Sequence, residues 1–206
     1  NQGALYLLND NEEDDKFFEM VACIAWDRIK MAQGRFLLEE GLLGACYFEK
    51  APIELTELIG SIERGAEAML HQAGATLTLE LDHPPIPLLA NTTALSSAIN
   101  NLLTNALQVG ATQLLLSAHR QEGEVVIRVV DNGPGMPRER LQRIFEPFYT
   151  TRSNGTGLGL AVVQSVVQAH QGKIEVASVE GEGSCFTLRL PCHQGVAQRQ
   201  AVGGAS

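Results

Sequence analysis

The sequence predicts an α/β fold, a two-layer sandwich of one mixed sheet with helices on one face. Helix-like and strand-like patterns interleave between residues 54 and 190, which is typical of α/β domains. Two pairs of neighbouring strand patterns are joined by short turns, one at Glu122 and Gly123 and one in the glycine-rich stretch 180–183. Turns this short connect antiparallel strands, so the sheet should mix antiparallel pairs with others.

The first segment predicts a long helix over residues 12–40, because Phe17, Val21, Ile24 and Met31 fall near one helical face. Its apolar face needs a partner, which leaves two interpretations: a core helix, or a helical hairpin or dimer stem. Pro52 marks the expected boundary. We therefore expect a partial helical segment over 1–50, a second domain over 51–192, and a small, polar, flexible tail over 193–206.

The second domain predicts four helices and five strands separated by turn residues. The proline-rich stretch 83–87 reads as a connection, and Thr92 or Thr93 can cap the helix that follows it. In chain order the expected elements are a helix over 54–72, a strand over 76–81, a helix over 92–109, strands over 113–118 and 124–130, a short helix over 138–144, a helix over 158–171, and strands over 173–177 and 184–190.

Composition restricts the class of protein. Of 206 residues, 45% are hydrophobic and 19% are charged, as in a globular protein with a core, and the net charge of -9 argues against a nucleic-acid partner. Four cysteines without metal-site spacing fit a reduced, cytoplasmic setting, and the strand pattern around Cys185 predicts a buried thiol. The sequence shows no signal peptide and no apolar run long enough to span a membrane. Its first residue is not Met, which suggests a fragment, so membrane attachment of a full-length protein stays open.

The segment INNLLTNALQV places Asn101 and Asn105 four residues apart on one helix face. Their amide oxygens are hard ligands that suit Mg²⁺, which takes few protein ligands and keeps most of its waters. The alternative is that both are solvated or capping amides.

The segment VVDNGPGM delivers Asp131 to the end of an apolar strand, followed by Gly133 and Gly135. A carboxylate there can accept a hydrogen bond from an amino group such as that of adenine, and glycines beside it let a flat base approach the backbone. The alternative is a plain turn, since the stretch is rich in turn formers.

Two further segments follow closely, IFEPFYTTR and SNGTGLGLAVV. The first predicts either part of a site or a small hydrophobic cluster beneath a loop. The second carries Gly155, Gly157 and Gly159 just before a helix, but it fits neither the G-x-G-x-x-G fingerprint nor a P-loop. Its free N–H groups and the helix N-terminus favour an anion, whereas the alternative is a flexible linker.

In their fixed order the four segments resemble the N, G1, F and G2 boxes of the catalytic and ATP-binding domain of sensor histidine kinases, within the wider superfamily of gyrase, Hsp90 and MutL. The resemblance covers about residues 52–191, including the final GEGSCFTLRLP. It implies the Bergerat-type sandwich, with ATP and Mg²⁺ as ligands. The sequence FEPFYTTR with a short lid is most similar to the nitrogen-regulation subgroup, which includes flagellar regulatory kinases.

The resemblance also implies residue roles. Asn105 would coordinate Mg²⁺, Asn101 would support the phosphate end, and Asp131 would bind the adenine amino group. Gly133 and Gly135 would shape the adenine pocket, and the lid that closes over the phosphates would end in Gly155, Thr156, Gly157, Leu158 and Gly159.

One departure concerns the phosphate charge. Many members of the family carry a lysine three positions after the magnesium asparagine, whereas this chain has Gln108. Arg152 in the lid is our candidate for the missing cation, and the alternative is a solvated loop charge.

The expected activity is that of a protein histidine kinase of a two-component phosphorelay. It would transfer the γ-phosphoryl group of ATP to a histidine on a dimerisation domain, for relay to an aspartate in the receiver domain of a response regulator. Related ATPases use a glutamate at the position of Asn101 to activate water, so transfer is favoured over hydrolysis and a DNA-topology or repair ATPase is disfavoured.

The phosphoryl acceptor itself is not found in this sequence. No His-Glu/Asp-x-x-x-Pro motif is present, so we expect the acceptor histidine upstream, on the first helix of a homodimer formed through N-terminal helices. The alternative function is a catalytically inactive, nucleotide-binding regulatory module.

Overall fold

The structure is a computed structural model of the chain. It describes the backbone of residues 3–10, 16–24 and 35–37, and both backbone and side chains over residues 50–82, 86–152 and 155–192. The chain divides into two compact units, Asn1–Lys50 and Ala51–Ser206, which are described separately. No helix within these described ranges is both long and apolar enough to cross a membrane.

The described part of the first unit is a three-stranded antiparallel sheet in the order β1-β2-β3. The helix predicted over 12–40 is therefore wrong where the structure describes it, and the rest of that helix lies outside the described residues. The physical reason is that the stretch is rich in aromatic and β-branched residues, which favour strands. Short apolar runs also match the helical period and the strand period equally well. The strands are β1 (Gly3–Asp10), β2 (Lys16–Ile24) and β3 (Arg35–Leu37).

The second unit contains a mixed five-stranded sheet in the order β5-β7-β8-β10-β9. The pair β5·β7 is parallel and the other pairs are antiparallel, which confirms the predicted mixed sheet. The strands are β5 (Thr76–Leu81), β7 (Gln113–Gln121), β8 (Glu124–Asp131), β9 (Lys173–Val179) and β10 (Gly183–Pro191).

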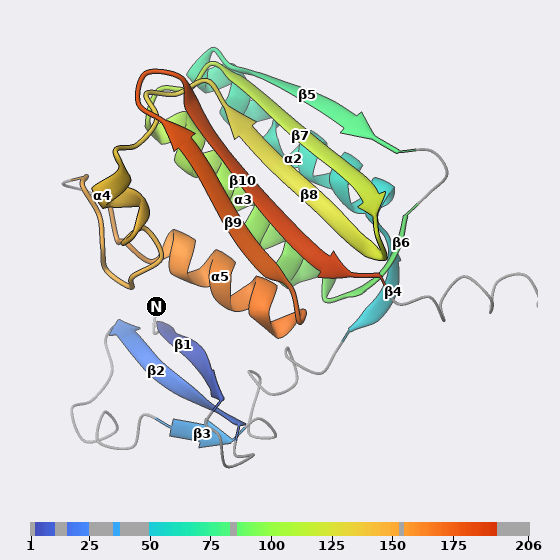
Figure 1. Cartoon of the computed structure of the whole chain (residues 1–206), viewed down its shortest axis with the longest axis vertical. Coiled ribbons are helices and arrows are strands. Elements are labelled where there is room, and N and C mark those ends of the chain that lie inside the picture. The colour runs from blue at the N-terminus through green and yellow to red at the C-terminus, as the bar shows by residue number, and fades with distance from the viewer. Residues whose placement is uncertain are drawn as a thin grey trace, which may run out of the picture. The chain divides into compact units, whose positions relative to one another are not determined.

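Helices α2, α3 and α5 lie on one side of this sheet, as Figure 1 shows, which confirms the two-layer arrangement. A separate two-stranded ribbon of β4 and β6 was not predicted, because its short, proline-containing strands give no periodic pattern. The bounds are α2 (Leu55–Ala73), α3 (Thr92–Gln108), α4 (Arg138–Leu141), α5 (Gly159–Ala169), β4 (Ala51–Glu54) and β6 (Pro87–Ala90).

The core lies between the helices and the sheet, and α3 is at its centre. The buried stripe of α3 follows the helical period, and each large side chain in it contributes about 1.5–3 kcal/mol through removal from water. The side chain of Asn91, rather than of Thr92 or Thr93, caps this helix by accepting the Ala94 N–H at 2.9 Å. The apolar core residues with no more than 2% exposure include Leu95, Ile99, Leu102 and Leu103 of α3 and Leu116, Ile127, Leu188 and Leu190 of the sheet.

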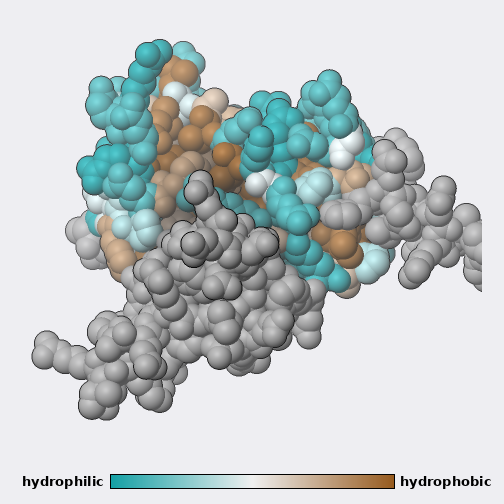
Figure 2. Space-filling model, turned by 60° about the horizontal axis from the view of Figure 1, so that its bottom comes forward, coloured by the Kyte–Doolittle hydropathy of each residue, from teal (hydrophilic) through white to brown (hydrophobic). Residues whose placement is uncertain are grey.

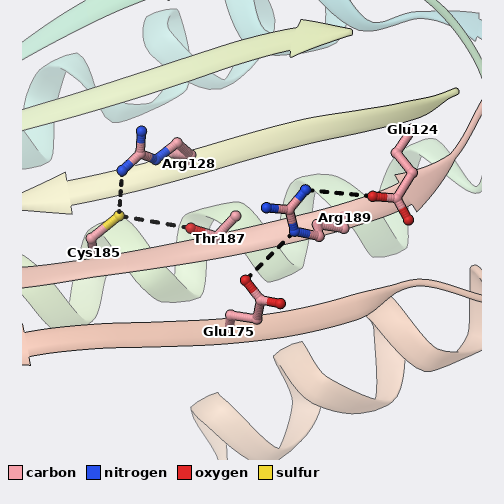
Figure 3. Close-up of polar contacts among 6 residues, drawn as sticks. All are labelled: Glu124, Arg128, Glu175, Cys185, Thr187 and Arg189. Atoms are coloured by element: carbon pink, nitrogen blue, oxygen red, sulfur yellow. Dashed lines mark hydrogen bonds and ion pairs between the residues drawn. The ribbon is translucent and has the colours of Figure 1, made fainter. Parts of the chain in front are cut away.

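The opposite face of the sheet is polar (Figure 3). Arg189 forms ion pairs with Glu124 and Glu175, each at 3.5 Å, and such surface pairs contribute about 0–1 kcal/mol. Cys185 lies on this face, where its Sγ is 3.5 Å from Nη2 of Arg128. The predicted burial of Cys185 is therefore wrong: the residue is half-buried, because the inward positions of β10 are the alternate ones.

His170 connects the end of α5 to the start of α3. The residue is 5% exposed, its Nε2 accepts the backbone N–H of Asn91 at 2.9 Å, and its Nδ1 lies 2.7 Å from the carbonyl oxygen of Val166. One buried imidazole therefore fixes the relative position of the two helices that frame the site described below.

We predict that His170→Leu lowers the free energy of unfolding by about 1–3 kcal/mol, because it leaves partly buried backbone groups without their partner. The matched control is His71→Leu, at an exposed position of α2, which should change stability by no more than about 0.5 kcal/mol. Urea denaturation of both variants measures the difference, and equal losses would contradict the connecting role of His170.

Candidate functional site

A pocket of about 530 Å³ opens where α3, α5, the end of β8 and the glycine-rich loop (residues 150–158, of which 150–152 and 155–158 are described) come together. Figure 2 shows that hydrophobic residues gather between hydrophilic areas on the face in view. The pocket lining has the same mixed character. It consists of Asn101, Thr104, Asn105, Ala106, Gln108, Val109, Asp131, Pro134, Gly135, Met136, Arg140, Ile144, Tyr149, Thr150, Thr151, Arg152, Gly155, Thr156, Gly157, Gly159, Leu160, Ser184 and Phe186.

One end of the pocket is formed by α3 and the first turn of α5. Asn101 and Asn105 lie on the same face of α3 and point toward Gly159, the first residue of α5. A Cβ atom placed on Gly159 would lie 3.7 Å from Nδ2 of Asn105 and 3.8 Å from Oδ1 of Asn101. Two amide side chains therefore meet a helix N-terminus, whose dipole and free N–H groups favour a negatively charged group.

The other end is formed by Asp131, the last residue of β8, which is 7% exposed. Burial raises the pKa of its carboxyl above the ordinary value, and the backbone N–H groups of Gly133 and Ser184 partly oppose that shift. The Gly133 N–H donates to Oδ1 of Asp131 at 2.8 Å. Since burial disfavours the charged form, this carboxyl gains most from a ligand that donates a hydrogen bond to it.

Two glycines around the pocket have backbone conformations that other residues avoid. Gly135 has φ +65°, and a Cβ there would collide with the carbonyl of Val179. Gly157 has φ +68°, and a Cβ there would collide with the backbone of Phe148. Because the Phe148 N–H donates to the Gly157 carbonyl at 2.9 Å, the glycine-rich loop is closed at its base.

The guanidinium of Arg152 lies on the polar face of α3. Its Nη2 donates to Oδ1 of Asn105 at 3.1 Å, and its Nη1 donates to Oε1 of Gln108. The side chain is thus directed toward the amide end of the pocket rather than into solvent. The structure brings the predicted lid cation to the helix position at which Gln108 replaces lysine.

Most of the sequence-predicted site residues line this pocket, but two do not. Gly133 lies behind the lining, next to the Asp131 carboxyl, and Leu158 precedes α5, where its N–H lies 3.4 Å from Oγ1 of Thr156. The predicted residues that line it together are Asn101, Asn105, Asp131, Gly135, Arg152, Gly155, Thr156, Gly157 and Gly159.

Sequence reasoning missed the apolar lining near Asp131. Met136 and Ile144 come from the connection between β8 and the glycine-rich loop, and Phe186 comes from β10. The signal for Met136 was present, since it follows the glycines of the Asp131 segment directly. Phe186 is distant in the sequence and reaches the site through the pairing of β10 with β8.

The comparison with known families covers the part of the chain that forms this pocket. Residues 90–194 match the family described as histidine kinase-, DNA gyrase B-, and HSP90-like ATPase. The match covers half of the chain and every predicted site residue, so this chain belongs to that family.

Similar proteins are histidine kinases. The sensor histidine kinase ZraS of Escherichia coli (strain K12) is 46% identical over 99 residues, which are 47% of this chain and 21% of ZraS. The catalytic domain of histidine kinase ThkA is 27% identical with a TM-score of 0.65, over 70% of this chain and 97% of that domain. Full-length ShkA in complex with AMPPNP is 29% identical with a TM-score of 0.64, over 69% of this chain and 31% of ShkA.

These likenesses confirm the predicted fold and the resemblance to the kinase catalytic domain. The chain matches only about a fifth of the length of the first curated relatives, 22% for ZraS of Salmonella typhimurium.

We predict that the buried charge of Asp131 destabilises the ligand-free protein at neutral pH. A carboxyl whose folded pKa lies above its unfolded value makes the folded state bind more protons, so stability falls as pH rises from the unfolded pKa through the folded pKa. Asp131→Asn should therefore raise Tm at pH 7, and the gain should shrink as the pH is lowered toward about 4.

The control for this measurement is Glu67→Gln, which removes a charge from an exposed position of α2. Thermal unfolding of both variants across pH tests the sign. A lower Tm for Asp131→Asn at pH 7 would show that the hydrogen bonds of the carboxylate outweigh its burial.

Proposed function

We propose that residues 51–192 form the ATP-binding catalytic domain of a sensor histidine kinase, a protein phosphotransferase. The observation that carries this proposal is the convergence of Asp131, the Asn101–Asn105 pair and the glycine-rich loop on one pocket. Membership of the ATPase family and likeness to histidine-kinase catalytic domains support it. The nitrogen-regulation subgroup stays a prediction.

In this proposal the adenine lies at the Asp131 end. Its exocyclic amino group donates to the Asp131 carboxylate, which is poorly solvated and gains a partner. Met136, Ile144 and Phe186 provide apolar surface for the faces of the base. Gly133 holds the Asp131 carboxyl from behind the lining through its N–H, and Gly135 lines the pocket with a backbone that carries no side chain, so the base can lie close to it.

The phosphates lie at the opposite end, between the asparagine pair and the start of α5. No group of three or more His, Cys, Asp or Glu that could hold a metal occurs in the described ranges. The amide oxygen of Asn105 is a hard donor of the kind that Mg²⁺ takes, and its second lone pair, beside the contact from Arg152, would hold the ion together with nucleotide phosphates and water. When bound, Mg²⁺ would neutralise charge on the phosphates, while Asn101 and the N–H groups of α5 orient them.

The phosphoryl acceptor comes from another polypeptide segment in this proposal. Both ring nitrogens of His170 are engaged in contacts inside the fold, which leaves that imidazole unable to act as nucleophile. Because the sequence contains no His-Glu/Asp-x-x-x-Pro motif, we place the acceptor histidine on a dimerisation segment outside residues 51–192 and outside the strands β1, β2 and β3. A receiver domain of a response regulator, in the cytoplasm, would take the phosphoryl group next.

The deciding experiment follows the γ-phosphate of labelled Mg-ATP with and without a histidine-bearing dimerisation segment supplied in trans. Acid-labile label on that segment is the expected result. Rapid release of free phosphate would instead indicate a hydrolase. ATP that is bound but stays intact with the segment present would favour the inactive regulatory module.

The two loop glycines make a matched pair of variants. We predict that Gly159→Ala folds normally, because the added Cβ has ordinary contact distances of 3.7–4.0 Å, but weakens ATP binding by filling the space for phosphate. Adenosine binding should be unchanged. Gly157→Ala should instead destabilise the loop, because of its positive φ and the collision with Phe148.

Calorimetric titration with ATP and adenosine, together with thermal unfolding, separates these effects. Wild-type ATP affinity in a folded Gly159→Ala protein would contradict the assignment of the phosphate end.

A further inference from the structure

Arg152 contacts two polar residues of α3 that lie about one helical turn apart. Asn105 and Gln108 are three residues apart, so their amide oxygens lie side by side on the helix surface. The two terminal nitrogens of the guanidinium donate to one oxygen each, Nη2 to Asn105 and Nη1 to Gln108. The rigid, planar fork is well suited to such a two-point contact, which a lysine ammonium could not reproduce.

Both partners of Arg152 are neutral. In the described residues the ion pairs of the carboxylates are with Arg143 and Arg189, and none is with Arg152. The backbone N–H of Arg152 is also engaged, by Oγ1 of Thr150 at 3.1 Å. Arg152 is therefore held in place by groups that leave its full positive charge available to an anion.

We propose that Gln108 is a positioning residue, which holds the Arg152 guanidinium at the phosphate end of the pocket without neutralising it. This inference rests on the proposed function. It assigns the phosphate-binding cation to the glycine-rich loop and makes its position depend on α3. The neutral amide oxygen of Gln108, which accepts from Arg152, is therefore the property that matters for ATP binding. The absence of a lysine charge at this position is not the whole difference.

The proposal makes the two positions interdependent. A lysine at 108 would bring a second cation against the guanidinium and displace it, so Gln108→Lys alone should weaken ATP binding. Combining Gln108→Lys with Arg152→Gln moves the cation from the loop to the helix, so that the amide then lies on the loop and the charged donor on α3. That double variant should bind ATP better than either single variant.

A near-isosteric variant separates positioning from simple attachment. Gln108→Glu keeps an acceptor for Arg152 and strengthens the contact through a charge-assisted bond, but it compensates the positive charge. If Gln108 only attached the loop to α3, this variant would bind ATP at least as well as wild type. If neutrality matters, as we propose, it should bind ATP about tenfold more weakly, the scale of one lost charge-assisted contact.

The experiment measures the dissociation constants of ATP and adenosine, with Mg²⁺, by calorimetry on the whole chain. The variants are Gln108→Glu, Gln108→Lys, Arg152→Gln and the double variant, with Gln72→Glu as a charge-changing control on the exposed part of α2. Adenosine affinity and Tm should stay at wild-type values in every variant, because Gln108 is exposed and its amide contacts Arg152 rather than Asp131. Losses should be confined to ATP.

Two results would overturn the inference: wild-type ATP affinity in Gln108→Glu, or a double variant no better than Gln108→Lys. Failure of the proposed function would look different. In that case the wild-type chain would bind neither ATP nor adenosine, or Asp131→Asn would leave adenosine affinity unchanged.

Discussion

The packing of α3 against the sheet is the constraint on which the site depends. Ile99, Leu102, Leu103 and Ala106 are buried, which fixes the rotation of the helix about its axis. Once that rotation is set, the positions of Asn101, Asn105 and Gln108 follow, because they lie on one stripe four and three residues apart. The apolar residues thus determine where the polar ones point, and a change of rotation would lose the core and the site together.

In the proposed function, the pocket exchanges stability for binding. At one end a carboxylate is kept in a poorly solvated place, and at the other an arginine is held by neutral partners. Neither arrangement is favourable for a protein without a ligand, since unpaired charges stabilise a fold less than paired ones. Both become favourable when a ligand brings an amino group to one end and negative charge to the other.

The sequence predicts well what local patterns determine. The elements of the second unit follow from hydrophobic period and turn residues, and the ordered segments indicated the site. Prediction failed for the first unit, where Phe17, Val21 and Ile24 suit a helix face and a strand equally, so strand pairing decides. It also missed the contact between Arg152 and Gln108, because 44 residues separate them and only the folded loop brings them together.

The distribution of carboxylates in the pocket bears on the reaction. Of the described residues that line it, Asp131 is the one with a carboxylate, and it lies at the end that we propose for adenine. The end that we propose for the phosphates offers amides, hydroxyls and the guanidinium of Arg152, none of which is a good proton acceptor at neutral pH. Attack by water would need such an acceptor, whereas an incoming imidazole brings its own nucleophilic nitrogen. The side chains of this pocket therefore suit transfer to a delivered histidine better than hydrolysis, because they supply positioning and charge and leave the nucleophile to the partner segment.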